Sequence, residues 1–227
     1  MVDKFSMQWH ITDRCDQRCK HCYIYEGKDK KCSLELDLNT LNLILEDFIS
    51  SCKQLGKEPF LVITGGDPLL YEGIWNFLEI LKKNKIHFGL LGNPFHLNYD
   101  VVKKLEDLGC INFQMSLDGL RETHDYIRKP GSFDATLDAL KYFEGSKIKT
   151  AIMTTVSKTN IAEIPYLAFG TMLKLLVLTI FVHFFSVKNV VKRLFRYLSY
   201  RCFTPSTSVD SSICQSCDVR NSTMASI

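Results

Sequence analysis

Three cysteines lie within one short stretch of the sequence, Cys15, Cys19 and Cys22, in the spacing C-x3-C-x2-C. Soft thiolate sulfurs are the ligands of iron–sulfur clusters, and three of them can hold three irons of a [4Fe–4S] cubane. The fourth iron is then left without a protein ligand and can bind a substrate. A zinc site is the alternative. Structural zinc is bound by four protein ligands, so His21, which lies between two of the cysteines in the sequence, would have to be the fourth. The spacing therefore favours an iron–sulfur cluster.

A glycine-rich turn, Gly65-Gly66-Asp67-Pro68, ends the second predicted strand. Two glycines allow the backbone to come close to a ligand, and a proline stiffens the turn. On its own this turn is also what an ordinary strand-ending loop looks like.

A third run of polar residues follows the fourth predicted strand. It reads Ser116-Leu117-Asp118-Gly119, then His124-Asp125, Arg128 and finally the segment 131–133, which is Gly-Ser-Phe. The guanidinium of Arg128 is well shaped to hold a carboxylate through two hydrogen bonds. The alternative for Arg128 is a surface arginine that caps a helix or forms an ion pair.

Taken together, these motifs resemble the radical S-adenosylmethionine (SAM) superfamily. The cysteine loop is similar to its C-x3-C-x-aromatic-C motif, with His21 in the aromatic slot, and the glycine turn is similar to its GGEP motif, with Asp67 in place of Glu. The run 116–133 resembles enzymes of the SPASM/twitch type that modify peptides and proteins, such as anaerobic sulfatase-maturating enzymes and ribosomal peptide maturases. The resemblance covers about residues 5–160.

The resemblance implies a function and a set of cofactors. In that family the open iron of a [4Fe–4S] cluster chelates the amino and carboxylate groups of SAM, and an electron from the cluster splits SAM to a 5′-deoxyadenosyl radical. The implied activity is modification of a peptide or protein substrate, with flavodoxin or ferredoxin as the electron donor. Two alternatives stay open: a small-molecule radical SAM enzyme, and a truncated, non-catalytic remnant that binds only the cluster and SAM.

The resemblance also implies a set of site residues, although it identifies no catalytic acid or base. The turn at 65–68 would receive the amino group of SAM, Ser116 and Arg128 would contact SAM, and Asn93 would line the adenosine unless it belongs to a plain turn. Tyr23, just past the cluster, is either an active-site aromatic or a packed one. The candidate metal ligands are Cys15, Cys19 and Cys22, and the candidate cofactor-binding residues are His21, Tyr23, Gly65, Gly66, Asp67, Pro68, Asn93, Ser116 and Arg128.

The elements that must position these residues alternate between apolar runs and amphipathic segments. Helical spacing marks segments around 38–52, 75–81, 101–105 and 137–143, with Asp37 or Asn39 opening the first. Strands that alternate with helices predict βα units and a parallel sheet, here an α/β fold of the partial, open (β/α)6 type. Because ligands bind at the carboxyl ends of such strands, the loops at 12–25, 64–70, 91–97 and 116–132 should share one mouth. The predicted strands are 5–11, 60–64, 87–91, 111–116 and 150–156.

Composition narrows the class of protein. The chain has 227 residues, of which 46% are hydrophobic and 23% charged, as in a globular protein with a sizeable core. A net charge of +3 is too small to argue for binding to nucleic acid or to an anionic membrane. The first residues include an acid and no long apolar run, so we expect no secretory leader and a cytoplasmic location. In that location we expect the nine cysteines to be thiols rather than disulfides. We also expect three of them, Cys32, Cys52 and Cys110, to be small buried residues.

Residues 168–227 differ from the preceding 1–167, which we interpret as the radical SAM core of five βα units and the start of a sixth. The later segment has seven basic residues against two acids. Its apolar stretch 175–187 is too short to span a bilayer and is expected to be a buried strand or helix, and irregular structure should follow from about 199. The pair Cys214 and Cys217 is either half a metal site or a chance pair. Truncation or a frameshift would explain the change in character.

Overall fold

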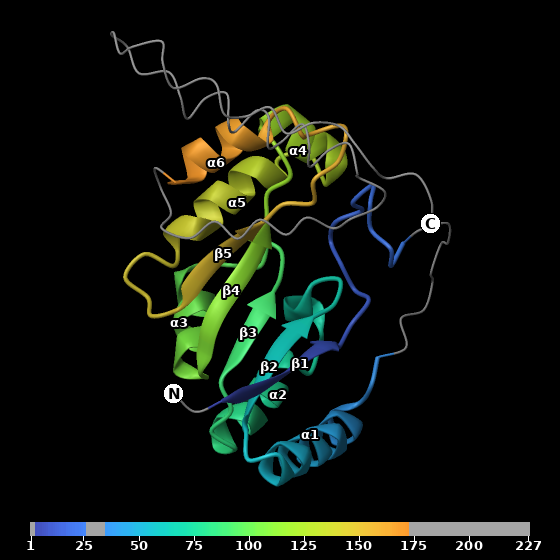
Figure 1. Cartoon of the computed structure of the whole chain (residues 1–227), viewed down its shortest axis with the longest axis vertical. Coiled ribbons are helices and arrows are strands. Elements are labelled where there is room, and N and C mark those ends of the chain that lie inside the picture. The colour runs from blue at the N-terminus through green and yellow to red at the C-terminus, as the bar shows by residue number, and fades with distance from the viewer. Residues whose placement is uncertain (1–2, 26–34, 173–227) are drawn as a thin grey trace, which may run out of the picture. The chain divides into compact units, whose positions relative to one another are not determined.

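The structure, a computed structural model, describes residues 3–25 and 35–172 (Figure 1). Within them, five strands form one sheet in the order β1-β2-β3-β4-β5, and every neighbouring pair is parallel. Each strand overlaps one of the five predicted segments, so the predicted α/β fold with a partial barrel is confirmed. The strands are β1 Lys4–His10, β2 Glu58–Thr64, β3 Phe88–Leu91, β4 Cys110–Ser116 and β5 Lys149–Met153.

Helices connect the strands in the alternating manner that the sequence predicts. The four amphipathic segments form α1, α2, α3 and α5, but α4 and a short 3-10 helix, η1, lie in segments expected to be loops. The sequence missed α4 because the helix is short and mostly polar, so no apolar period marks it. The bounds are α1 Leu38–Gln54, η1 Pro68–Leu70, α2 Ile74–Lys83, α3 Tyr99–Asp107, α4 Arg121–Ile127, α5 Ser132–Lys141 and α6 Ile164–Met172.

Helix α1 shows how local sequence sets an element. Asp37, one of the two predicted caps, accepts a hydrogen bond from the backbone N–H of Thr40 at 2.9 Å and so satisfies a donor that the first helical turn leaves free. The residues that face the sheet recur at helical spacing. They are Leu41, Leu45, Phe48 and Cys52, and all of them are buried.

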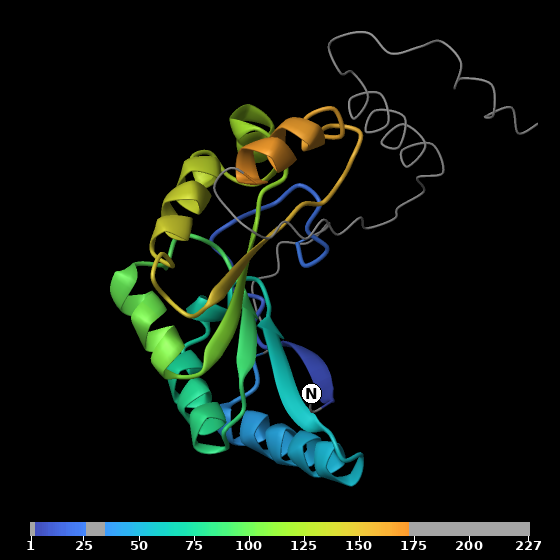
Figure 2. The ribbon, with the colours of Figure 1, turned by 60° about the vertical axis from the view of Figure 1, so that its left-hand side comes forward.

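The core fills the space between the sheet and the helices. Figure 2 shows α1, α2, α3 and α5 along one face of the sheet. Fully buried aromatic rings, those of Phe77, Phe88 and Phe113, lie among the aliphatic side chains there. Cys52 and Cys110 are buried as predicted, whereas Cys32 lies outside the described residues.

The carboxyl ends of the parallel strands meet at one end of the sheet. The cysteine loop that follows β1 and the helix α4 that follows β4 both lie there (Figures 1 and 2). In residues 3–25 and 35–172, no helix is both long and apolar enough to cross a membrane. The predicted sixth unit, the apolar stretch 175–187 and the pair Cys214 and Cys217 fall outside the described residues.

Candidate active site

The loop that carries the three cysteines is tied to two neighbouring segments by backbone hydrogen bonds. The N–H of Gly66 donates to the carbonyl of Thr12 and the N–H of Asp67 to that of Arg14, both at 2.7 Å. On the other side, the N–H of Lys20 donates to the carbonyl of Ile127 at 2.8 Å. The cysteine loop is therefore fixed between the turn after β2 and the end of α4.

The two glycines of the turn after β2 are required by this packing. A Cβ on Gly65 would lie 2.4 Å from the carbonyl oxygen of Thr12, and one on Gly66 would lie 2.3 Å from that of Arg14. No side chain fits at either distance. The two glycines thus allow the turn after β2 to approach the cysteine loop closely, and their contact with SAM stays a prediction.

The three thiols are free and half-buried. Burial raises the pKa of Cys19 to about 11 against the opposing effect of the Arg128 guanidinium, and burial also raises the pKa of Cys15. Cys15 and Cys19 are therefore protonated at neutral pH in the metal-free protein. Metal binding must release these protons, since the thiolate is the ligand.

Nitrogen donors from other elements reach two of the sulfurs. Asn93 Nδ2, on the loop after β3, lies 3.2 Å from Cys15 Sγ, and Arg128 Nη1 lies 3.6 Å from Cys19 Sγ. Donors of this kind stabilise negative charge on sulfur. Loops after β1, β3 and β4 therefore converge, as the predicted shared mouth requires.

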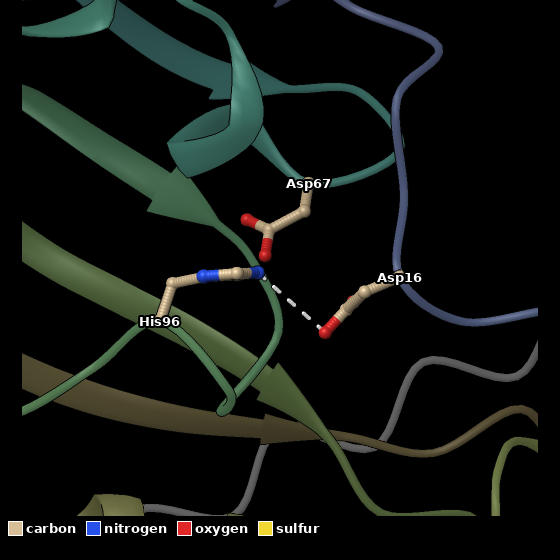
Figure 3. A group of neighbouring side chains, drawn as sticks. All are labelled: Asp16, Asp67 and His96. Carbon is tan, nitrogen blue, oxygen red and sulfur yellow. Dashed lines mark ion pairs between the residues drawn. The ribbon is translucent and has the colours of Figure 1, made fainter.

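Three ionisable side chains, from the segments after β1, β2 and β3, lie close together (Figure 3). Asp16, Asp67 and His96 each offer one atom, and these atoms lie within 4.8 Å of one another, with His96 Nε2 3.6 Å from Asp16 Oδ2. Asp67 is 0% exposed and its Oδ2 has no hydrogen-bond partner. Burial, reinforced by the nearby charge of Asp16, raises the pKa of Asp67 to about 7. An unpaired buried acceptor beside a second carboxylate suits a positively charged ligand group.

Asp118, after β4, holds Arg128 in position. Asp118 is fully buried, and its Oδ2 accepts a hydrogen bond from Arg128 Nε at 2.6 Å while its Oδ1 accepts from the backbone N–H of Thr155 at 2.8 Å. Arg128 is only 12% exposed, and its Nη1 remains directed at Cys19. Burial lowers the pKa of His21, so its ring is neutral at pH 7 and its 3.7 Å contact with Asp118 is not an ion pair.

The remaining residues of the third run build the scaffold around Arg128. His124 Nδ1 accepts a hydrogen bond from the backbone N–H of Asp118 at 2.9 Å, and burial lowers the pKa of His124 to about 4, so the ring is neutral. Asp125 accepts from the backbone N–H groups of Gly131 and Phe133 at 2.7 and 2.8 Å, where α5 begins. This part of the run therefore fixes the backbone on both sides of Arg128.

This arrangement has a counterpart among known proteins. The family model of the radical SAM superfamily matches residues 9–168, well over half of the chain. The chain belongs to the radical SAM superfamily. Membership implies a [4Fe–4S] cluster and SAM as cofactors, in agreement with the sequence prediction, and Cys15, Cys19 and Cys22 carry the cysteine motif.

The chain matches individual radical SAM proteins over only part of their length. The chain is 28% identical over 158 residues to an Fe-coproporphyrin III synthase of Methanosarcina barkeri, covering 69% of this chain and 38% of that protein. It is 23% identical over 157 residues to the sporulation killing factor maturation protein SkfB of Bacillus subtilis, covering 68% and 36%. The chain thus spans less than half the length of either relative.

Among solved structures, the fold is similar to that of Streptococcus suis SuiB bound to its precursor peptide SuiA. The TM-score is 0.66 with 18% sequence identity, covering 88% of this chain and 46% of SuiB. At this identity the likeness concerns the fold.

The structure brings most of the predicted radical SAM site residues to one place. The contacts above link six of them: Cys15, Cys19, His21, Asp67, Asn93 and Arg128. The turn at Gly65 and Gly66 packs directly against the cysteine loop. Pro68, which is buried, starts η1 behind Asp67. Ser116 ends β4. Tyr23 is turned outward: it is 76% exposed, and its hydroxyl lies 3.4 Å from His10 Nδ1.

Sequence reasoning about this radical SAM site did not single out three residues that the structure places in it. Asp16 and His96 flank Asp67, and Asp118 orients Arg128. Asp118 was visible as part of the motif after β4, and His96 falls in a loop predicted to share the mouth. No local signal marked the contact between Asp16 and His96.

The donor set fits the implied cofactors. Three free thiols on one short loop suit three irons of a cubane. The unpaired Asp67 Oδ2 beside them is a buried acceptor for which the described residues provide no partner. Both features match a cluster and a ligand that carries an amino group.

Proposed function

We propose that this chain is the core of a radical SAM enzyme that modifies a peptide or protein, with a [4Fe–4S] cluster on Cys15, Cys19 and Cys22. The observation that carries the proposal is the set of three half-buried, free thiols on one loop at the carboxyl edge of the sheet. When bound, the cluster and SAM supply a 5′-deoxyadenosyl radical that abstracts hydrogen from the substrate.

The side chains around the thiols would bind and orient SAM. Asp67, once ionised, would accept a hydrogen bond from the amino N–H of SAM on its unpaired Oδ2. Arg128 would offer guanidinium N–H groups to the carboxylate of SAM, while its Nε stays bound to Asp118. Asp118 therefore acts as a positioning residue, and the neutral His21 adds no competing charge.

A peptide or protein substrate is supported by the run from Ser116 to Phe133, which resembles peptide-modifying enzymes, and by the 23% identity to the maturation protein SkfB. A tetrapyrrole is the second candidate, because the 28% identity to an Fe-coproporphyrin III synthase points to a small molecule. Either substrate requires a one-electron donor of the flavodoxin or ferredoxin class.

Anaerobic iron–sulfur reconstitution tests the cluster. We expect about four irons and four sulfides per chain, the content of one cubane. The variant Cys15→Ala/Cys19→Ala/Cys22→Ala should hold no cluster, whereas Cys52→Ala, which removes a buried thiol on α1, should hold a full one. A full cluster in the triple variant would refute the assignment.

Reduction with dithionite in the presence of SAM tests the activity. We expect 5′-deoxyadenosine to accumulate, and a peptide substrate to accelerate its release. Acceleration by iron coproporphyrin III instead would favour the tetrapyrrole. A protein that binds the cluster and SAM but releases no 5′-deoxyadenosine would be the non-catalytic remnant.

A further inference from the structure

The loop after β3 sends one side chain to the cluster loop. Asn93 is 9% exposed, and its Nδ2 lies 3.2 Å from Cys15 Sγ and 2.8 Å from Asp16 Oδ1. A single amide nitrogen therefore contacts a candidate cluster ligand and the residue that follows it.

The carboxylate of Asp16 determines which end of the Asn93 amide faces the sulfur of Cys15. A carboxylate such as that of Asp16 only accepts hydrogen bonds, so it must face the NH2 group of Asn93 and not the amide oxygen. That group has two hydrogens, one for Asp16 and one for Cys15. Asp16 thus fixes the amide in the orientation that donates to sulfur.

The backbone of Asn93 is held as firmly as its side chain. A hydrogen bond from the Asn93 backbone acts on the Asp67 carboxylate and lowers its pKa against the larger effect of burial. The preceding Gly92 donates its N–H to the carbonyl of Gln114 at 3.1 Å, and a Cβ on Gly92 would lie 3.2 Å from Asp67 Oδ1. Asn93 is therefore preorganised from both sides.

We propose that Asn93 is a positioning residue that raises the reduction potential of the cluster through its N–H···S hydrogen bond to Cys15. This inference rests on the proposed function. Reduction adds one electron, supplied by the external donor, and the added negative charge is shared with the ligand sulfurs. A hydrogen-bond donor on a sulfur stabilises the reduced form more than the oxidised form, so the potential rises.

The test is an anaerobic redox titration of reconstituted protein, followed by the electron-spin signal of the reduced cluster. Asn93→Leu keeps the approximate volume but has no donor, and Asn93→Ala removes the amide altogether. At a fixed solution potential, both variants should show an approximately tenfold lower ratio of reduced to oxidised cluster. That change corresponds to a midpoint about 59 mV more negative for a one-electron couple.

Asn98→Ala is the matched control. Asn98 follows on the same connection and caps α3 by accepting from the backbone N–H of Val101 at 2.8 Å. Its loss should lower stability and leave the midpoint unchanged. A wild-type midpoint in clustered Asn93→Leu and Asn93→Ala would overturn the inference while the proposed function stands.

A measurement on the wild-type protein covers the case in which the Asn93 variants do not retain a cluster. With 15N-labelled asparagine, pulsed electron-spin spectroscopy of the reduced cluster should detect coupling to one side-chain nitrogen. Absence of that coupling would overturn the inference. Failure of wild-type protein to assemble any cluster would instead overturn the proposed function.

Discussion

At the scale of single residues, Asp67 has the most unusual environment in the described part of the chain. Its carboxylate is buried, one oxygen lacks a partner, and its pKa is raised to about 7. A buried acceptor without a partner costs about 1–3 kcal/mol. An N–H donor of a ligand would remove that cost, and we propose that Asp67 makes this contact with SAM and so couples SAM binding to proton release.

The first prediction is that the affinity for SAM depends on pH through Asp67. The amino N–H of SAM is accepted best by the ionised carboxylate, whose pKa in the metal-free protein is about 7. Affinity should therefore fall roughly tenfold per pH unit below 7 and level off above it. Calorimetry on the clustered protein between pH 6 and 8 measures this. Asp67→Asn should bind more weakly and without that slope, and a persistent slope would assign the titration to another group.

Arg128 has two roles that must be separated. Its Nε pairs with the buried Asp118, so Arg128→Ala would leave an uncompensated buried charge and cost about 3–5 kcal/mol of folding stability. Arg128→Lys keeps a positive charge against Asp118 but loses the fork that holds a carboxylate.

The second prediction is therefore made for Arg128→Lys. The cluster should assemble, and SAM binding should weaken by about 1.5–3 kcal/mol, the contribution of a hydrogen bond to a charged group. Equilibrium binding of SAM to the clustered protein measures it. Arg121→Lys, which alters an exposed pair with Asp134 on neighbouring elements, is the control and should bind as wild type. Unchanged affinity in Arg128→Lys would leave Arg128 a structural role only.

At the scale of elements, the site depends on two loops that touch through their backbones. The turn after β2 donates to the carbonyls of Thr12 and Arg14, and its glycines leave no space for a side chain. The contact between the two loops is what keeps the cysteines beside Asp67.

The third prediction follows from this contact. A Cβ on Gly66 would lie 2.3 Å from the Arg14 carbonyl oxygen, so Gly66→Ala must push the loops apart. We expect a loss of about 1–3 kcal/mol in the free energy of unfolding and a reduced iron content after reconstitution. Chemical denaturation and iron analysis measure the two effects.

Gly89→Ala supplies the comparison. Gly89 is buried in β3, but a Cβ there would meet its nearest neighbour, Asn112, at an ordinary 3.5 Å. This variant should retain iron. Full iron content in Gly66→Ala would mean that the cysteine loop holds its shape without the turn after β2.

At the scale of the whole molecule, the family match ends at residue 168, close to the predicted boundary at 167. The match covers 38% and 36% of the two relatives described above, less than half of either protein. We propose that 1–167 is the cofactor-binding core and that 168–227 is a separate segment.

The fourth prediction concerns that boundary. The sequence from about residue 199 is rich in Ser and Thr and lacks helical period, so limited proteolysis of the full chain should cut readily after about Tyr200. Mass spectrometry should then identify a protected fragment of about residues 5–165. A protease-resistant segment 168–227 with metal of its own would contradict the proposal and would indicate a second site.

The sequence by itself determined the order of the elements and the position of the cysteine motif. Hydrophobic periods of two and of 3.6 residues are local, so β1 to β5, α1, α2, α3 and α5 could be predicted from neighbouring residues. Cys15, Cys19 and Cys22 lie on one loop, and Asp37 caps the helix that directly follows it, so these features also need only nearby sequence.

The tertiary structure decided which side chains meet at the mouth. Asn93 contacts Cys15 across 78 positions of sequence, and Arg128 contacts Cys19 across 109. The parallel topology predicted that their loops share one edge, but not which atoms would touch, because that depends on the register of the strands and the close packing of the loops. Gly66 illustrates the difference: the sequence suggested only a close backbone approach, and the fold showed that the carbonyl of Arg14 lies directly against this glycine.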